Sequence, residues 1–343
     1  MSGGVDSSVA AQLLVESGYD VTGVFIKTWS PDYIECTWRE DRLDAMRVAA
    51  QLGITFITLD LEKEYKNEVI DYMLAEYKAG NTPNPDIMCN REVKFGAFYK
   101  YVKSLNPQAY LATGHYVKIE NLSLSKARDV DKDQVYFLSQ IDKSILPDLI
   151  FPLGDLYKSE VREIAKERGL YVSEKKDSQG LCMLGDISIK DFLINEIGVQ
   201  EKGEIRNNIG EVIGTHQGSI LYTIGERIAT DKNEVHYVTH KDTKQNVIYA
   251  SLKFNIGLQK NNFAVKNWNS TSSIEIKEGE VYEGQTRYHE PISDFKILNF
   301  INKKEEDRLY LEIEPLNKDI LLVAGQTLVL YDGGTMLGGG IIL

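Results

Sequence analysis

The sequence predicts an α/β fold in which a domain built on a parallel sheet is followed by a small linker domain and a β-rich C-terminal domain. Two observations carry this prediction. Up to about residue 180, short apolar runs alternate with segments of helical periodicity, as in βαβ units. From about residue 257, short runs alternate between apolar and polar residues at regular spacing, which is typical of a small all-β sandwich or barrel.

The first part divides into alternating helices and strands. The expected helices are an apolar stripe from Val9 to Leu14, Leu43–Leu52, a run from Val69 to Tyr77, and Val161–Arg168; the expected strands are Val21–Ile26, Ile54–Leu59 and Ala109–Thr113. Gly18, Gly53 and Gly80 follow the first three helices, where a residue of positive φ commonly ends a helix.

The later part has shorter elements. Asn207–Gly218 is Gly-rich and predicts turns. The expected strands are Ile220–Ile224, Val235–Val238, Ser273–Glu275, Lys296–Asn299, Leu309–Glu314, Leu321–Val323 and Thr327–Tyr331.

Composition excludes several classes of protein. The 343 residues are 43% hydrophobic and 26% charged, unlike disordered or collagen-like chains. No apolar run approaches the ~18 residues that span a bilayer, and the first residues lack a signal-peptide pattern. We therefore expect a cytoplasmic protein with no membrane partner. The three cysteines do not make a disulfide framework and are expected as reduced thiols.

Charge is unevenly distributed along the chain. Thirty-nine basic and 51 acidic side chains give a net charge of −12, which argues against a nucleic-acid partner. Residues 91–128, however, hold seven basic and two acidic side chains, a balance of +5. Such a stretch is compatible with a polyanionic substrate.

The strongest local motif is Ser2-Gly3-Gly4-Val5-Asp6-Ser7-Ser8, which opens the first helix. Two glycines allow the backbone to approach a phosphate, and the helix N-terminus directs N–H groups toward it. Asp6 suits a Mg²⁺ ion between phosphates, and the lysine of a Walker A loop is absent. The alternative is a Gly-rich turn with a capping side chain. Such a loop usually follows a strand, so either that strand is lacking or another covers this edge.

A second candidate site lies in NTPNPDIMCNREVKFG, residues 81–96. Two prolines flanked by Asn predict a rigid turn that presents Asp86 and Cys89 on one face, where the carboxylate can serve the thiol as acid or base. Arg91 and Lys94 would favour a thiolate. The alternative is that Cys89 is a small buried hydrophobe, as free cysteines often are.

A third candidate is Cys182, in the polar segment EKKDSQGLCMLG over Glu174–Gly185. Its glycines and lysines favour a loop with a reactive thiol. If the fold brings Cys182 to Cys89, the two can relay sulfur or form a redox pair; the alternative is two unrelated cysteines. Cys36 is assigned a structural role.

Together these motifs resemble the tRNA-specific 2-thiouridylase family of the PP-loop ATP pyrophosphatase superfamily. The resembling segments are SGGVDSSVAA, TPNPDIMCNREVKFG, ATGHY, KDQVYFLSQ, FPLG, KKDSQGLCMLG and the final LGGGII, in the family's order along nearly the whole chain. The resemblance implies a PP-loop (adenine nucleotide α hydrolase-like) catalytic domain over 1–197, a small central tRNA-binding domain over 198–256 and a C-terminal β-barrel over 257–343.

The resemblance also implies roles for individual residues. Contacts to ATP are expected from Met1, Ser2, Gly3, Gly4, Val5, Asp6, Ser7, Ser8, Ile26 and Gly114. Cys89 is the expected nucleophile, Cys182 the persulfide-bearing cysteine and Asp86 an acid or base. Contacts to tRNA are expected from Asn84, Pro85, Asp86, His115, Lys132, Asp133, Gln134, Arg287, Tyr288 and Gln326. Without the resemblance, His115 equally fits a strand-end histidine, Lys132 a solvated turn and Arg287–Tyr288 a cross-strand pair.

The implied reaction is an ATP-dependent sulfur transfer, with Mg²⁺, to the wobble uridine of tRNAs for Lys, Glu and Gln. Adenylation makes O2 of the uridine a leaving group, Cys182 supplies sulfur received from a donor such as a cysteine desulfurase or sulfur-relay protein, and Cys89 releases the product as a Cys89–Cys182 disulfide forms. A base in the anticodon loop can be splayed out for this chemistry.

Three alternatives stay open. An iron–sulfur cluster held by Cys89, Cys182 and a further ligand such as Asp86 would replace the persulfide route. A PP-loop amide ligase would need no pair of cysteines. A non-catalytic tRNA-binding relative would not bind ATP.

Overall fold

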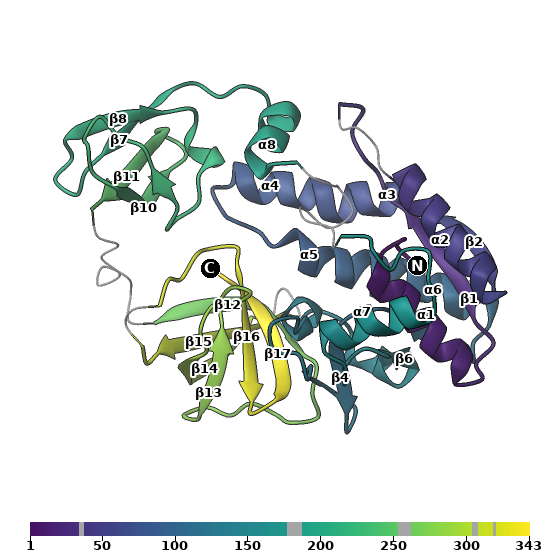
Figure 1. Ribbon diagram of the computed structural model, residues 1–343. Coiled ribbons are helices and arrows are strands. Elements are labelled where there is room, and N and C mark those ends of the chain that lie inside the picture. Colours follow the sequence, from purple (N-terminus) through teal and green to yellow (C-terminus); the bar gives the residue numbers. More distant parts are fainter. Residues whose placement is uncertain (34–37, 177–186, 253–261, 304–307, 318–319) are drawn as a thin grey trace.

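The computed structural model describes residues 1–33, 38–176, 187–252, 262–303, 308–317 and 320–343. Figure 1 shows an N-terminal α/β part beside two β-rich parts, a small sheet and, below it, a barrel. The predicted fold class is confirmed: a parallel-stranded α/β part is followed by a small sheet and a closed barrel.

The described residues of the N-terminal part form two parallel strand pairs. Strand β1 (Thr22–Lys27) pairs with β2 (Thr55–Asp60), from Thr22↔Thr55 to Lys27↔Asp60. Strand β3 (Leu111–Ala112) pairs with β6 (Leu149–Ile150). The strand expected over Ala109–Thr113 is therefore shorter than predicted.

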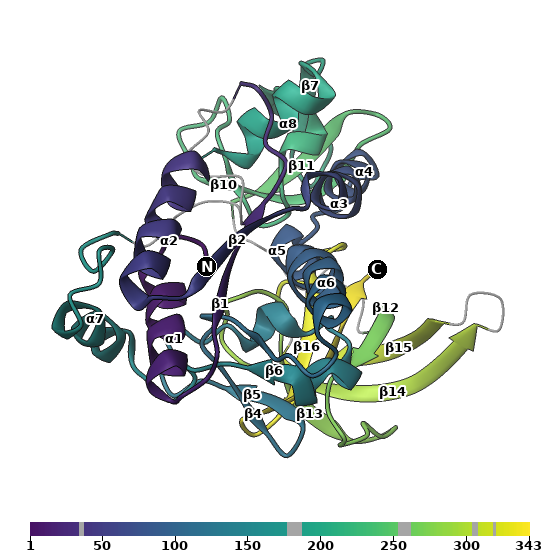
Figure 2. The ribbon, with the colours of Figure 1, turned by 90° about the vertical axis from the view of Figure 1, so that its right-hand side faces the viewer.

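Helices lie on both sides of β1 and β2 (Figure 2). On one side are α1 (Val5–Glu16), α2 (Trp38–Leu52) and α7 (Lys158–Glu167), which share a core that includes Val9, Val48 and Val161. On the other side are α3 (Glu62–Tyr65), the π-helix η1 (Lys66–Asp71), α4 (Tyr72–Lys78), α5 (Pro85–Met88), the π-helix η2 (Cys89–Ala97) and α6 (Phe98–Leu105). The helix α8 (Ile189–Ile197) leads to the small sheet.

The expected glycine ends of three helices are confirmed. Gly18, Gly53 and Gly80 have φ values of 83°, 67° and 90°, a conformation that glycine adopts without a Cβ penalty. The glycines thus fix where α1, α2 and α4 stop and where the following strands or loops begin.

The small sheet has the strand order β8-β7-β11-β10-β9. Its strands are β7 (Gly203–Arg206), β8 (Val212–His216), β9 (Arg227–Ile228), β10 (His236–Asp242) and β11 (Val247–Ser251). Two predictions were wrong here. The run 207–218 contains β8, and the expected strand Ile220–Ile224 overlaps the 3₁₀ turn η5 (Ser219–Leu221), whose apolar side chains are buried without a strand partner.

Six strands close the C-terminal barrel in the order β12-β15-β14-β13-β16-β17, with β17 pairing back to β12. They are β12 (Phe263–Ser270), β13 (Val281–Gln285), β14 (Ser293–Lys303), β15 (Arg308–Pro315), β16 (Thr327–Asp332) and β17 (Thr335–Ile342). The expected strands at 273–275 and 321–323 are wrong, because both segments are connections between barrel strands.

A hairpin that follows β3 joins the N-terminal part to the barrel. Strands β4 (Val117–Glu120) and β5 (Ser123–Lys126) extend the barrel sheet, with Ser125 opposite Thr335 of β17. Just after the hairpin lie the 3₁₀ helices η3 (Val135–Leu138) and η4 (Lys143–Asp148). The barrel therefore packs directly on segments that follow β3.

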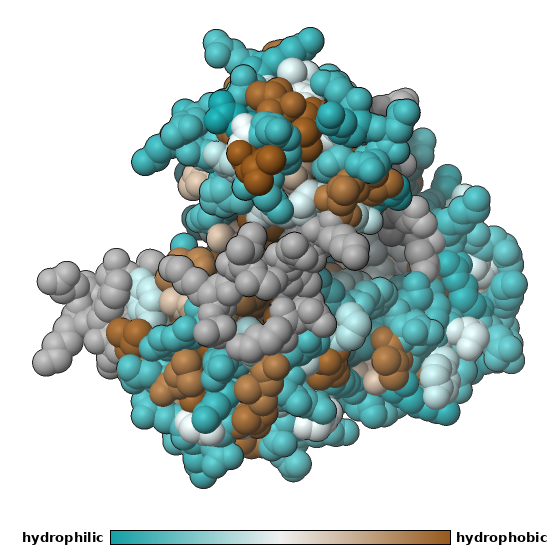
Figure 3. Space-filling model, turned by 90° about the vertical axis from the view of Figure 1, so that its left-hand side faces the viewer, coloured by the Kyte–Doolittle hydropathy of each residue, from teal (hydrophilic) through white to brown (hydrophobic). Residues whose placement is uncertain are grey.

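Among the described residues, none of the helices is both long and apolar enough to cross a membrane. Figure 3 shows a mostly hydrophilic surface over the small sheet and the barrel, with hydrophobic side chains in separate small groups.

Candidate functional site

The loop before α1 has the geometry of an anion site. Gly4 is the N-cap of α1, and no side chain caps the first turn. Gly3 has φ +77°, and a Cβ there would lie 2.2 Å from the backbone oxygen of Asp41. The hydroxyls of Ser2 and Ser7 lie 3.1 Å apart. The uncapped N–H groups at the start of a 12-residue helix suit a phosphate group.

Asp6 in this loop is held by two partners from elsewhere in the fold. The Lys158 ammonium at the start of α7 lies 2.6 Å from Asp6 Oδ1, and the Tyr116 hydroxyl donates to the same oxygen at 2.9 Å. A Mg²⁺ ion on Asp6 would compete with Lys158 for that oxygen. Sequence reasoning assigned no role to Lys158 or Tyr116, although Tyr116 is the last residue of the quoted motif ATGHY and Lys158 lies four residues after FPLG.

Gly114 and His115 connect the loop to the helix that begins at Cys89. A Cβ on Gly114 would lie 2.8 Å from the backbone of Asp6 and Ser7, so only glycine fits against the loop without a shift. The next residue, His115, packs its ring 5.7 Å from that of Phe95 in η2. The structure thus brings two predicted sites together through consecutive residues.

His115 is held in its neutral form by its surroundings. Its Nδ1 lies 2.8 Å from Thr113 Oγ1, and its ring packs edge-on against Phe151. Burial, followed by the nearby Lys94 charge, lowers the pKa of His115 well below its usual value. It therefore has the features expected of a strand-end histidine as well as a position between the two candidate sites.

The Asn84–Cys89 segment forms a short capped helix. Asn84 Oδ1 accepts hydrogen bonds from the amides of Asp86 and Ile87, both at 3.2 Å, and Pro85 occupies the first helical position. Asp86 is half-buried, whereas Cys89 is fully buried in the main core at the start of η2. The thiol is therefore enclosed, as the alternative interpretation of Cys89 expected, while its position at a π-helix is one often found at functional sites.

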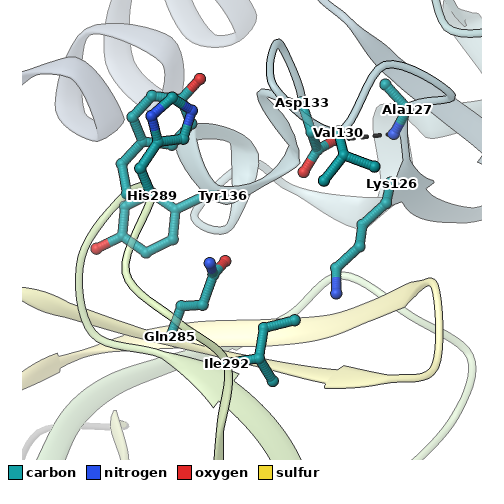
Figure 4. A pocket seen from close by; sticks show the side chains of 9 residues that line it. Lys126, Ala127, Val130, Asp133, Tyr136, Gln285, His289 and Ile292 are labelled. Atoms are coloured by element: carbon teal, nitrogen blue, oxygen red, sulfur yellow. Dashed lines mark hydrogen bonds between the residues drawn. The ribbon is translucent and has the colours of Figure 1, made fainter. Parts of the chain in front are cut away.

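Two of the segments expected to contact tRNA, 132–134 and 287–288, meet where the hairpin adjoins the barrel. Asp133, Tyr288 and His289 line a small pocket of about 90 Å³ with Lys126 and Gln285 (Figure 4). The rings of Tyr288 and His289 are stacked, with centroids 3.9 Å apart.

Asp133 has an unusual environment in this pocket. Its carboxylate accepts a hydrogen bond from the Ala127 amide at 2.8 Å. Burial nevertheless raises the pKa of Asp133 to about 6. Its carboxyl group therefore holds its proton to a higher pH than an exposed aspartate does.

Other predicted tRNA contacts make internal bonds. Gln134 Oε1 accepts from the Tyr116 amide, Arg287 donates to the carbonyl of Ile224, and Gln326 donates to the carbonyl of Thr82. The backbone amide of Lys132 donates to the Asp129 carbonyl at 3.2 Å, which closes a turn.

The remaining predicted residues lie away from these contacts or outside the described part of the chain. Ile26 lies on β1 opposite Leu59, and the Met1 nitrogen donates to the Val24 carbonyl on the same strand. Cys182 and Cys36 lie outside the described residues. Among the described residues, no cluster of three or more His, Cys, Asp or Glu side chains is arranged to hold a metal ion.

Known protein families and curated relatives match this chain along nearly its whole length. The family model described as tRNA methyl transferase HUP domain matches residues 1–186, the tRNA methyl transferase PRC-barrel domain matches 190–251, and the aminomethyltransferase beta-barrel domain matches 260–342. A tRNA-specific 2-thiouridylase from Listeria monocytogenes is 40% identical over 100% of this chain and 93% of its own length. The chain belongs to the tRNA-specific 2-thiouridylase family.

Other members of the thiouridylase family are equally similar. The proteins of that name from Streptococcus mutans and Streptococcus pyogenes are 40% and 41% identical, each over 100% of this chain and 93% of their own lengths. Among solved structures, NMN synthetase from Francisella tularensis matches with a TM-score of 0.34 and 20% identity, over 56% of this chain and 68% of its own.

Proposed function

We propose that this chain is a tRNA 2-thiouridylase that uses ATP to replace O2 of the wobble uridine by sulfur. The observation that carries the proposal is the contact of Gly114 with the phosphate loop and of His115 with the helix of Cys89. Activation of an oxygen and attack by sulfur must occur on one base, so a nucleotide site and a thiol joined by adjacent residues fit this reaction.

The chain's residues divide the work in two stages. The first turn of α1, Gly3 and Lys158 bind the phosphates of ATP while O2 of the uridine is adenylated and pyrophosphate leaves. The terminal sulfur of a Cys182 persulfide then bonds to C2 of the uridine, and AMP leaves with the oxygen. The Cys89 thiolate then attacks Sγ of Cys182. The bond between that sulfur and the sulfur on C2 breaks, so the 2-thiouridine leaves, and a Cys89–Cys182 disulfide remains for an external thiol to reduce.

Cys89 needs a change of environment during this cycle, because its side chain is fully buried. We propose that docking of the anticodon stem-loop beside α5 exposes it, with Asn84, Pro85 and Asp86 at the base. The persulfide donor, a cysteine desulfurase or sulfur-relay protein of the cytoplasm, and Mg²⁺ on the phosphates complete the proposal.

The family models carry descriptions that name methyl transfer, which predicts a different product. A methyl transferase that uses an activated methyl donor needs no pyrophosphate-binding loop, whereas thiolation needs ATP to make O2 a leaving group. The uncapped loop at Gly3 and Gly4 therefore favours thiolation.

The test incubates unmodified tRNA with the protein, ATP, Mg²⁺ and a protein persulfide donor, and digests the tRNA for nucleoside mass spectrometry. We expect 2-thiouridine from wild type and its loss from Cys89→Ser and Cys182→Ser. Free sulfide is left out because it can bypass Cys182. A methylated nucleoside, no thiolated product, or undiminished product from Cys182→Ser would overturn the proposal.

The same preparations decide between the persulfide and the cluster route. Protein purified without oxygen is expected to thiolate tRNA without bound iron. Activity that follows the iron content would instead favour the cluster.

A further inference from the structure

A turn of the barrel is hydrogen-bonded to the chain just before the short helix α5. Thr82 is hydrogen-bonded on both sides: its amide donates to the Ala324 carbonyl at 2.9 Å, and its carbonyl accepts from the Gln326 side chain at 2.7 Å. Between them Gly325, at φ +90°, lies so close that a Cβ would approach the Thr82 nitrogen to 2.9 Å. We call residues 323–326 the barrel turn.

The barrel turn is itself anchored to the last strand of the barrel. The Gly325 amide donates to the Ile342 carbonyl at 2.9 Å, and the Ile342 amide donates to the Gln326 carbonyl at 2.8 Å. Because both ends of β17 are fixed in the closed sheet, the turn has a defined position from which to hold Thr82.

A second link lies one residue further along the barrel, at Thr327, and two residues further along the other segment, at Asn84. The fully buried Tyr136 hydroxyl donates to the Thr327 carbonyl at the start of β16, 2.8 Å away. The Asn84 side chain hydrogen-bonds to the same Tyr136 hydroxyl. Asn84 is also the N-cap of α5. The barrel therefore contacts the segment before Cys89 at Thr82 and, through Tyr136, at Asn84.

We infer that Gln326 is a positioning residue, which sets the place of α5 and Cys89 through Thr82. Pro83 and Pro85 have fixed φ angles, so a shift at Thr82 passes along the backbone to the helix rather than being absorbed. The Gln326 side-chain amide donates directly to the Thr82 carbonyl, 2.7 Å away. This inference rests on the proposed function for its effect on rate.

The experiment compares Gln326→Glu with a matched variant, Gln140→Glu. Glutamate keeps the size of glutamine but cannot donate a hydrogen bond to a carbonyl. Gln140 is the control because its side chain makes the same kind of bond, to the Gly339 carbonyl, between the N-terminal part and the barrel but away from Thr82.

Two measurements are made on each full-length variant: steady-state thiolation with tRNA affinity, and hydrogen exchange of the amides from Thr82 to Cys89. For Gln326→Glu we expect kcat to fall about five- to tenfold, as for loss of one hydrogen bond, with tRNA Kd within about twofold. Exchange at 82–89 should become faster. For Gln140→Glu we expect a lower Tm with kcat and exchange at 82–89 near those of wild type.

Different results separate the two ideas. An unchanged kcat with weaker tRNA binding would mean that Gln326 contacts tRNA directly, which overturns the inference. Unchanged exchange at 82–89, or the same change in both variants, also overturns it. If wild type makes no 2-thiouridine, the proposed function fails, and the exchange measurement still decides whether the turn holds this segment.

Discussion

At the residue scale, the Lys158–Asp6 pair holds a cation at the loop to which the proposed function assigns the phosphates of ATP. Lys158 is mostly buried, with its side chain 14% exposed, and its ammonium lies 2.6 Å from Asp6 in the loop before α1. A charge held in such a position does not have to be brought to the substrate, so it can stabilise a leaving pyrophosphate at little reorganisation cost.

Replacing Lys158 by Met should therefore slow ATP-dependent chemistry. Loss of one charge-assisted contact, about 1.5–3 kcal/mol, corresponds to roughly a 10- to 100-fold fall in tRNA-dependent pyrophosphate release. Lys166→Met is the control on the same helix, because that ammonium pairs with the exposed Glu174. Equal rates for the two variants would contradict this role of Lys158.

Asp133 should make folding stability depend on pH. Its pKa is raised to about 6 in the folded protein from 3.8, so between these values the folded state holds a proton that the unfolded chain has lost. The free energy of unfolding should then fall as pH rises from about 4 to 6.

The Asp133→Asn variant removes this titration and keeps an acceptor for the Ala127 amide. We expect the variant to lack this fall and to exceed wild type by about 1–2 kcal/mol at pH 7. Urea unfolding at several pH values measures both effects. Parallel stability curves for the two proteins would contradict the expectation.

At the element scale, the short helix α5 depends on its cap. Asn84 satisfies two amides of the first turn, so Asn84→Ala should cost about 1 kcal/mol of unfolding free energy. Asn84→Asp keeps an accepting oxygen and should retain most of that stability. Urea unfolding of both variants tests this; equal losses would show that the amide group, through Tyr136, matters more than the cap.

Helix periodicity and glycine ends were predictable because they are local properties. The positions of α1, α2 and α7 follow from their apolar spacing, and Gly18 and Gly53 end the first two. The strand β17 escaped prediction because three consecutive glycines, residues 338–340, interrupt its sequence TMLGGGII, and glycine is depleted in strands. Its glycines are required by close neighbours: a Cβ on Gly338 would lie 2.2 Å from the Asn269 carbonyl oxygen.

The candidate site was predictable only where one segment carries the chemistry. The glycines of the phosphate loop and the Asn84 turn lie within single motifs, so sequence spacing exposes them. Contacts between distant segments place Lys158 and Tyr116 at Asp6 and form the hydrogen bond from Gln326 to Thr82. No periodicity within one segment reports such contacts.

At the scale of the whole molecule, folding redistributes the basic stretch 91–128. Lys103, Lys118 and Arg128 pair with Asp148, Asp155 and Glu160 from outside it. The local balance of +5 is therefore partly neutralised in the fold. An electropositive face beside the Asp86–Cys89 helix, expected from this stretch, stays a prediction that depends on its other basic side chains.

That prediction has a direct measurement in the salt dependence of tRNA binding. Each phosphate neutralised contributes about −0.7 to −0.9 to the slope of log K against log salt concentration. Lys132→Gln, four residues beyond this stretch in a segment that resembles a tRNA contact, should make the slope shallower by about that amount. Lys103→Gln should change it less, because the Lys103 ammonium already lies 2.9 Å from Asp148. Binding that is insensitive to salt, or equal changes in both variants, would show that tRNA is held elsewhere or by uncharged contacts. The binding face would then have no excess of basic side chains, in keeping with the net charge of −12 of the whole protein.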